Sequence, residues 1–154
     1  MTSDALNEQQ RTAWARYQRM RVRLSGRLNR ELAAATGLSE ADYEILGALA
    51  ERPDESVRAL ALRCGLEWEK SRLSHQLRRM EERGLLVREA CREDNRGSVV
   101  RLTDTGRTLA ADARDAYEAA VARHVVAALT PEQMEALGEI AEALLAPLAE
   151  GHQG

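Results

Sequence analysis

A polar run at residues 70–79 could do chemistry, because most of its side chains donate hydrogen bonds. It reads Lys-Ser-Arg-Leu-Ser-His-Gln-Leu-Arg-Arg. Such side chains bind phosphate oxygens, and arginine can also form two hydrogen bonds to guanine. Leu73 and Leu77 lie four residues apart, which would anchor one side of a helix in a core and leave the other side polar. The run is typical of a helix that contacts double-stranded DNA.

The predicted DNA contacts on this helix are Lys70, Ser71, Arg72, Ser74, His75, Arg78 and Arg79. Arg72 is the candidate for a contact to a base edge, because it lies near the start of the helix. The alternative is an ordinary solvated polar face, which the nearby Glu67 and Glu69 favour.

A second candidate is the tip of a predicted hairpin, Asp94-Asn95-Arg96-Gly97. Its flanks, 85–88 and 98–102, are rich in Leu and Val and would pair as strands. Arg96 could then enter a minor groove, where narrow A·T-rich stretches concentrate negative potential. Gly97 would let the tip turn tightly, and Asp94 would orient an arginine. The alternative is an ordinary polar turn.

Helices must position both segments, and their boundaries follow from hydrophobic spacing and cap residues. We expect one over 8–35, and others from Ser39 to before Pro53, from Ser56 to Gly65, after Leu66 to about Arg83, after Thr103 and after Thr130. The third would turn Val57, Leu60, Ala61 and Cys64 inward.

This order predicts a mainly α fold with a small β-hairpin wing. Helices followed by a hairpin, with a short turn between the third and fourth helices, form a winged helix-turn-helix. The last helix carries Leu137, Leu144 and Leu148 in a narrow apolar seam, which needs a partner.

The distribution of charge also favours a DNA-facing side, although the net charge of the 154 residues is −3. Residues 11–30 hold seven Arg and no acid, and residues 57–101 carry a net charge of +4. Residues 31–56 and 102–154 carry −6 each. The local field decides whether a phosphate backbone is attracted.

Composition argues against several other classes of protein. The chain has no apolar run of the length that a membrane span needs, and its first ten residues lack a signal-peptide pattern. Two cysteines do not make a disulfide framework, so we expect a cytoplasmic protein. The sequence contains no glycine-rich phosphate loop and no nucleophile elbow, so we predict that it is not an enzyme and has no cofactor.

Residues 38–106 resemble the multiple-antibiotic-resistance regulator (MarR) family. The matching pieces are Leu38-Ser39, Tyr43-Glu44-Ile45-Leu46, Arg58-Ala59-Leu60-Ala61, Gly65-Leu66, 71–88, Asp94-Asn95-Arg96-Gly97 and Leu102-Thr103-Asp104-Thr105-Gly106. Their order and spacing carry the resemblance, because each piece alone is weak. Trp68, in the turn before the fourth helix, departs from the family pattern.

The resemblance implies a homodimer that regulates transcription, as a repressor, at a pseudo-palindromic operator. Residues 1–37 and 104–150 would form dimerisation helices around a DNA-binding domain at 38–103. The family's DNA contacts fall on Lys70 to Arg79 and on Arg96 of the Asp-x-Arg wing motif.

The resemblance also implies a small phenolic or lipophilic effector, bound between the dimer helices and the winged domain. Candidate pocket residues are Trp14, Tyr17, Met20 and Tyr43. Alternatively, these side chains simply pack the dimer core.

Two other functions stay open. Cys91, beside Arg92, could be a redox-sensing thiol, because a nearby cation lowers a thiol's pKa; otherwise it is inert. A winged helix could also dock protein without any operator. The three histidines lie apart from Cys and acidic partners, so we expect no metal site.

Overall fold

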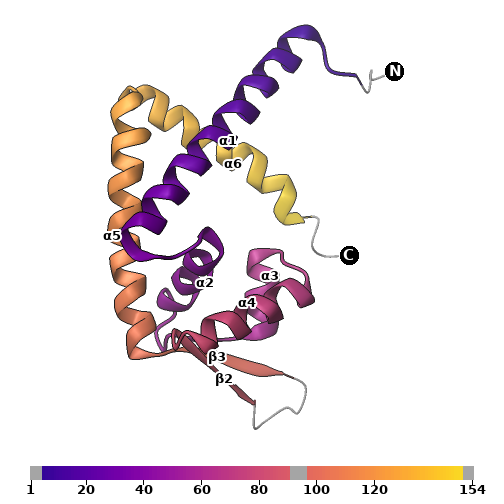
Figure 1. The fold of residues 1–154 in the computed structure, drawn as a ribbon. Coiled ribbons are helices and arrows are strands. Elements are labelled where there is room, and N and C mark those ends of the chain that lie inside the picture. The colour runs from indigo at the N-terminus through magenta and orange to yellow at the C-terminus, as the bar shows by residue number, and fades with distance from the viewer. Residues whose placement is uncertain (1–4, 91–96, 151–154) are drawn as a thin grey trace. The chain divides into compact units, whose positions relative to one another are not determined.

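The computed structural model describes residues 5–90 and 97–150, and the chain forms two compact units, 1–117 and 118–154. Figure 1 shows the elements. They are α1 (Glu8–Thr36), α2 (Glu40–Ala50), β1 (Ser56–Arg58), α3 (Ala59–Leu66), α4 (Lys70–Glu82), β2 (Leu86–Ala90), β3 (Ser98–Leu102), α5 (Asp104–His124), a 3-10 turn (Val126–Ala128) and α6 (Pro131–Glu150). The fold is a winged helix-turn-helix with long flanking helices, so the predicted fold class is confirmed.

Side-chain caps begin α2 and α6, and a glycine ends α1, as the sequence predicted. Before α2, the Ser39 hydroxyl accepts from the Asp42 N–H, and the Asp42 carboxylate accepts from the Ser39 N–H. Thr130 and Gln133 make the same reciprocal pair before α6. Gly37 ends α1 with a φ of 74°, a left-handed conformation that favours glycine.

The sheet contains a strand that the sequence analysis missed. Its order is β1-β3-β2, all antiparallel, with Val57 opposite Val100 and Leu86 opposite Leu102. The prediction that Ser56 begins a helix was wrong, because Ser56–Arg58 pairs with β3 and α3 begins only at Ala59. The predicted inward face of α3 was wrong for the same reason: Leu60 is 63% exposed, Cys64 is exposed, and Leu62 is buried instead.

One hydrophobic core holds the first unit together. It joins α1, α2, α4, the sheet and the start of α5 through Leu32, Leu38, Ile45, Leu46, Leu49, Leu73, Leu77, Met80, Leu86, Val100 and Ala113. Three of these, Leu73, Leu77 and Met80, form the buried stripe of α4. The polar face of α4 must therefore point outward.

A close backbone contact joins the base of the wing to α5. The Thr103 N–H donates to the Leu85 carbonyl over 3.2 Å, and its hydroxyl donates to the Gly84 carbonyl over 2.6 Å. The same hydroxyl accepts from the Gly106 N–H over 3.0 Å. A Cβ at Gly106 would collide with the Leu85 carbonyl oxygen, so only glycine fits at this position.

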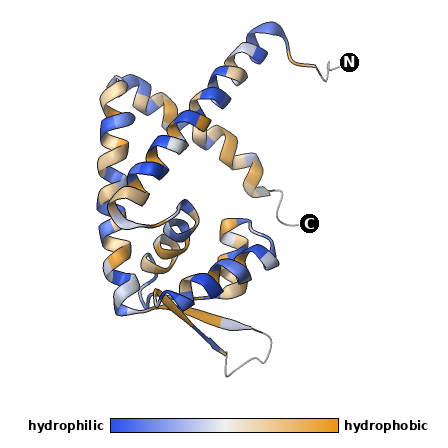
Figure 2. Cartoon of the chain, in the orientation of Figure 1, coloured by the Kyte–Doolittle hydropathy of each residue, from blue (hydrophilic) through white to orange (hydrophobic). Residues whose placement is uncertain are grey.

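The second unit exposes a large apolar surface on α6. Met134, Leu137, Ile140, Leu144, Leu145 and Leu148 are all exposed. Figure 2 shows much of α6 in the hydrophobic colour, whereas α4 and the first half of α1 are mostly hydrophilic. Among the helices that the structure describes, none is long and apolar enough to cross a membrane.

Candidate nucleic-acid interface

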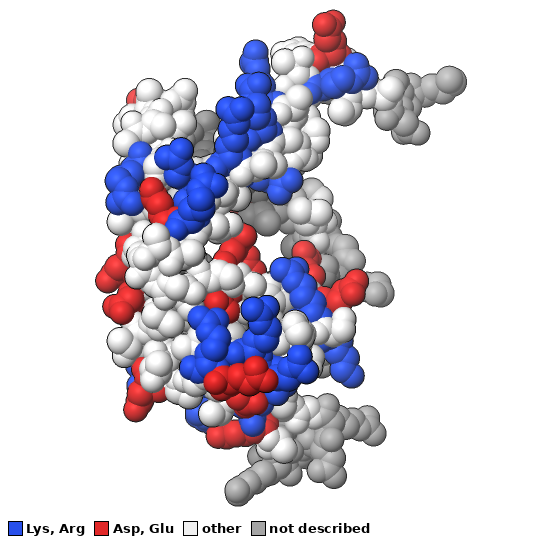
Figure 3. All heavy atoms as spheres, in the orientation of Figure 1, with Lys and Arg blue, Asp and Glu red and all other residues white. Residues whose placement is uncertain are grey.

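The polar side chains of α4 share one exposed face. Lys70, Ser71, Arg72, Ser74, His75, Arg78 and Arg79 are all exposed, while Leu73 and Leu77 are buried. The structure therefore brings together the seven residues that the sequence singled out on this helix. His75 Nδ1 lies 3.0 Å from an Arg78 guanidinium nitrogen, so these two residues restrain each other's position. Figure 3 shows basic side chains gathered over this part of the molecule, with some acidic ones among them.

Arg72 lies against the ring of Trp68. Its guanidinium carbon is 3.9 Å from the centre of the ring, and Trp68 is only 8% exposed. The negative face of an indole attracts a cation, so the ring holds the guanidinium in place. Burial and the nearby Glu40 raise the pKa of Glu44. The positive charge of Arg72 partly offsets this rise, so Glu44 also lies in the electrostatic field of Arg72. The contact with Trp68 therefore restricts the conformations of the Arg72 side chain.

Asp42 links α2 to α4. It is 4% exposed, and its carboxylate accepts from Gln76 Nε2 over 2.6 Å and from Arg83 over 2.8 Å. Burial works to raise the pKa of Asp42, but the hydrogen bond and charge of Arg83, with the Ser39 N–H, outweigh it and hold that pKa below its ordinary value. One ionised side chain therefore fixes the middle and the end of α4 against α2. The sequence predicted a helix that begins at Ser39 but gave no sign of these links, because Gln76 and Arg83 lie far from Asp42 along the chain.

A second polar contact ties α4 to the wing. Glu81 accepts from the Arg88 N–H over 2.8 Å and from its guanidinium over 3.1 Å. The hydrogen bond from the Arg88 N–H, followed by that from its guanidinium, lowers the pKa of Glu81. The wing strands β2 and β3 are thus held in a defined position beside α4. Gly97 is exposed just before β3, while Cys91, Asp94 and Arg96 lie outside the described residues.

Comparison with known proteins identifies the family. The model of the MarR family matches residues 36–97. AbsC, a MarR family transcriptional regulator from Streptomyces coelicolor, is 34% identical, with 97% of each chain covered and a TM-score of 0.85. Sco3205, a MarR family transcriptional regulator from the same organism solved in complex with DNA, is 33% identical over 99% of this chain and 92% of that one, with a TM-score of 0.87.

The chain belongs to the MarR family. MarR-family proteins are transcription regulators. A mutant form of MarR from E. coli shares the fold at 20% identity, over 93% of this chain and 99% of that one, with a TM-score of 0.77. No curated protein sequence matched the chain.

The predicted effector residues of this MarR-family chain lie in two places. Trp14 and Tyr17 of α1 stack on each other at 5.1 Å, and both are exposed, as is Met20. Tyr43 stacks instead on Tyr117 of α5 at 4.8 Å. Burial, with Glu40 and Glu44 nearby, raises the pKa of Tyr117. The four predicted side chains therefore belong to two separate aromatic stacks, with Met20 exposed on the same helix as the first.

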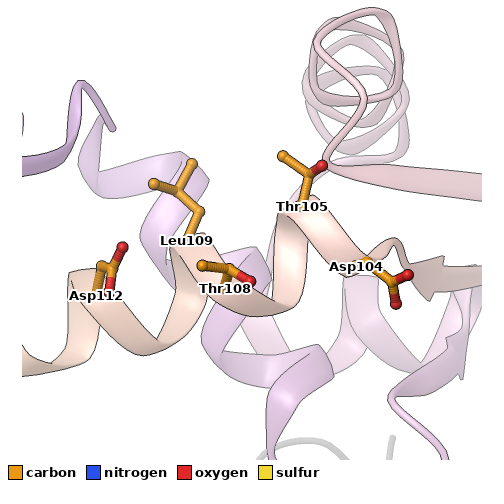
Figure 4. A pocket seen from close by; sticks show the side chains of 5 residues that line it. All are labelled: Asp104, Thr105, Thr108, Leu109 and Asp112. Carbon is orange, nitrogen blue, oxygen red and sulfur yellow. The ribbon is translucent and has the colours of Figure 1, made fainter.

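A shallow hollow lies along the start of α5, lined by Asp104, Thr105, Thr108, Leu109 and Asp112 (Figure 4). Its volume is about 400 Å³, and none of the predicted effector residues lines it. Asp104 is engaged with Arg107, which also pairs with Glu55 beside β1. These contacts brace α5 against the sheet.

Proposed function

We propose that this MarR-family regulator binds double-stranded DNA as a homodimer, at a pseudo-palindromic operator, and acts as a repressor. The observation that carries the proposal is the exposed polar face of α4, which Leu73, Leu77 and Met80 hold rigidly against the core. Sco3205, a relative with 33% identity, was solved in complex with DNA. A helix held in this way can enter a major groove without first having to be ordered.

In this proposal α4 lies in the major groove, with Lys70, Ser71, Ser74, His75, Arg78 and Arg79 contacting phosphates or bases. Arg72 donates two hydrogen bonds to a guanine, from a guanidinium that Trp68 already orients. Arg96 at the tip of the wing enters the minor groove, with Asp94 and Gly97 supporting the tip.

The dimer would form through residues 1–37 and 104–150, around a DNA-binding domain at 38–103. The exposed apolar side chains of α6, and Trp14, Tyr17 and Met20 of α1, support this part of the proposal. Burying such side chains between two copies removes apolar area from water, which stabilises the dimer. Two copies would then place two α4 helices about one turn of DNA apart.

A small phenolic or lipophilic effector would release the DNA. The exposed Trp14–Tyr17 stack is the feature that supports an aromatic ligand, with Met20 beside it and Tyr43 as the candidate on α2. The effector must bind more tightly to the dimer whose α4 helices are wrongly spaced for the operator, because only a difference in affinity shifts the population.

The test is a binding titration against the DNA just upstream of the chain's own gene, at two salt concentrations. We expect tight, sequence-selective binding that weakens as salt rises, because phosphate contacts release counterions. Binding that is indifferent to sequence, or absent with every DNA tested, would contradict the proposal and favour a protein-docking module.

A further inference from the structure

Glu69 lies at the start of α4, the helix that is proposed to enter the major groove. Its carbonyl accepts from the Leu73 N–H over 3.1 Å, which makes Glu69 the N-cap residue of the helix. Glu69 is also exposed. Residues near the start of a recognition helix lie closest to the base edges when the helix is in the groove. The fold therefore places a carboxylate at the end of α4 that would approach the bases.

The charge of Glu69 is opposite to that of the helix it begins. Residues 70–80 contain four Lys or Arg residues and no Asp or Glu. The phosphate backbone is negative, so a carboxylate at this surface reduces the attraction that the basic side chains supply. A carboxylate here can favour binding only where it meets a hydrogen-bond donor of the DNA.

The Glu69 side chain does not cap the helix. Its backbone has the extended conformation of an N-cap residue, with a φ of −70° and a ψ of 150°, but the side chain makes no hydrogen bond to the first turn of α4. Ser39 and Thr130 make that hydrogen bond before α2 and α6. Short polar side chains at this position stabilise a helix, so α4 lacks a stabilising contact that two other helices have. Such exceptions to local rules are expected at functional sites.

The Glu69 carboxylate also lacks a cation. Among the ion pairs within residues 5–90 and 97–150, none involves Glu69. The two carboxylates that hold α4 in place differ in this respect, because Asp42 pairs with Arg83 and Glu81 pairs with Arg88. Within this part of the chain, the oxygens of Glu69 can therefore accept hydrogen bonds from a ligand.

We propose that Glu69 recognises a cytosine of the operator by accepting a hydrogen bond from its N4 amino group. The proposal rests on the proposed function, in which α4 lies in the major groove, and adds a residue that determines specificity. An ionised carboxylate only accepts hydrogen bonds. In the major groove, cytosine presents a donor and no acceptor, whereas guanine presents only acceptors, so the carboxylate favours cytosine and disfavours guanine.

The position of this cytosine follows from the distance between Glu69 and Arg72. Three residues of a helix advance by about 4.5 Å, and successive base pairs lie about 3.4 Å apart. The cytosine should therefore belong to a base pair next to the one whose guanine Arg72 is proposed to bind.

The test measures base preference. Wild type, Glu69→Ala and Glu69→Gln are titrated against operators in which each base pair is changed in turn to the other three. For wild type, replacing one C·G pair in each half-site should weaken binding at least about fivefold. Glu69→Ala should lose the preference at this pair. Glu69→Gln should move the preference to adenine, because a side-chain amide both donates and accepts, as the edge of adenine does.

Two further variants are controls. Glu82→Gln removes an exposed carboxylate at the other end of α4 and should keep the wild-type preference at every base pair. Glu69→Ser should lose the same preference as Glu69→Ala but raise the Tm, because serine caps a helix. A higher Tm shows that the lost preference does not come from unfolding.

Three results would count against the proposal. Equal strengthening of Glu69→Ala on every sequence would mean that Glu69 only repels phosphate. Loss of preference at the same base pair that Arg72→Ala affects would mean that Glu69 acts by orienting Arg72. A wild type that bound every sequence alike would instead refute the proposed function itself.

Discussion

Arg72 and Trp68 show how a single contact could serve recognition. An arginine side chain that is free in solution loses conformational entropy when it binds a base, and that loss reduces its net contribution to the free energy of binding. The indole of Trp68 is buried in the core and holds the guanidinium at 3.9 Å from its ring, so much of that freedom is already lost. The buried tryptophan thus connects the core of the domain with its exposed face.

Arg72→Ala should weaken operator binding by about 1–3 kcal/mol and relax the preference at one base pair. Trp68→Leu should keep an apolar residue in the core and reduce the same preference by less, because the arginine remains but is no longer oriented. Titrations against operators with single base-pair changes measure both effects. If either variant lost affinity equally for every sequence, Arg72 would be a phosphate contact.

Gly106 allows the backbone of α5 to approach the backbone of Leu85 closely, because glycine has no Cβ. A Cβ there would meet the backbone of Leu85, which cannot move without disturbing the base of the wing. Gly106→Ala should lower the free energy of unfolding by about 3 kcal/mol, measured by urea denaturation. Gly47→Ala, in α2, is the matched control: its Cβ would meet nothing within 4 Å, so it should be neutral or stabilising. Equal stability of the two variants would refute this account.

Among the elements, α4 owes its position to polar as well as apolar contacts. The buried stripe of Leu73, Leu77 and Met80 fixes its depth, while Asp42 and Glu81 fix its middle and its C-terminal end against α2 and β2. Hydrogen bonds to a buried carboxylate are directional and costly to leave unmade. They therefore restrict rotation and sliding of α4, which apolar packing alone resists less strongly.

Asp42→Asn should lower the free energy of unfolding by about 2 kcal/mol at pH 7, because it removes the charge that faces Arg83. The pKa of Asp42 in the folded protein lies below its ordinary value of 3.8. Ionised Asp42 therefore stabilises the folded protein at pH values above 3.8, and this stabilisation is lost as the pH falls through the lowered pKa. The difference between wild type and variant should therefore shrink at pH 3. Urea denaturation at both pH values measures it; an equal difference at both would exclude ionised Asp42 as the cause.

The elements also show how far sequence reasoning reaches. Features that depend on residues close in sequence could be predicted. They are the caps at Ser39 and Thr130, the hairpin and the polar face of α4. Strand β1 could not, because three residues form a strand only when β3, over 40 positions later, lies beside them. The links from Asp42 to Gln76 and Arg83 likewise span 34 and 41 positions.

Across the whole molecule, charge is separated although the total is small. The net charge of −3 hides a basic α1, a basic segment around α4 and an acidic α6. Because the local field decides what is attracted, the basic segments would attract a phosphate backbone although the whole chain is acidic. In the proposed dimer, the exposed apolar side chains of α6 would supply the stability.

Leu144→Asp tests whether dimerisation and DNA binding are coupled. Leu144 is exposed on α6 and, in the proposed dimer, becomes buried against the second copy. A carboxylate there would lose water without gaining a partner, which should destabilise the dimer by about 2 kcal/mol or more. A monomer offers one α4 instead of two, so operator affinity should fall with it, and light scattering and titration on the same samples report both. Leu144→Met keeps the apolar surface and should leave both unchanged. A Leu144→Asp monomer that bound the operator as tightly as wild type would show that one copy suffices, and the coupled dimer would have to be abandoned.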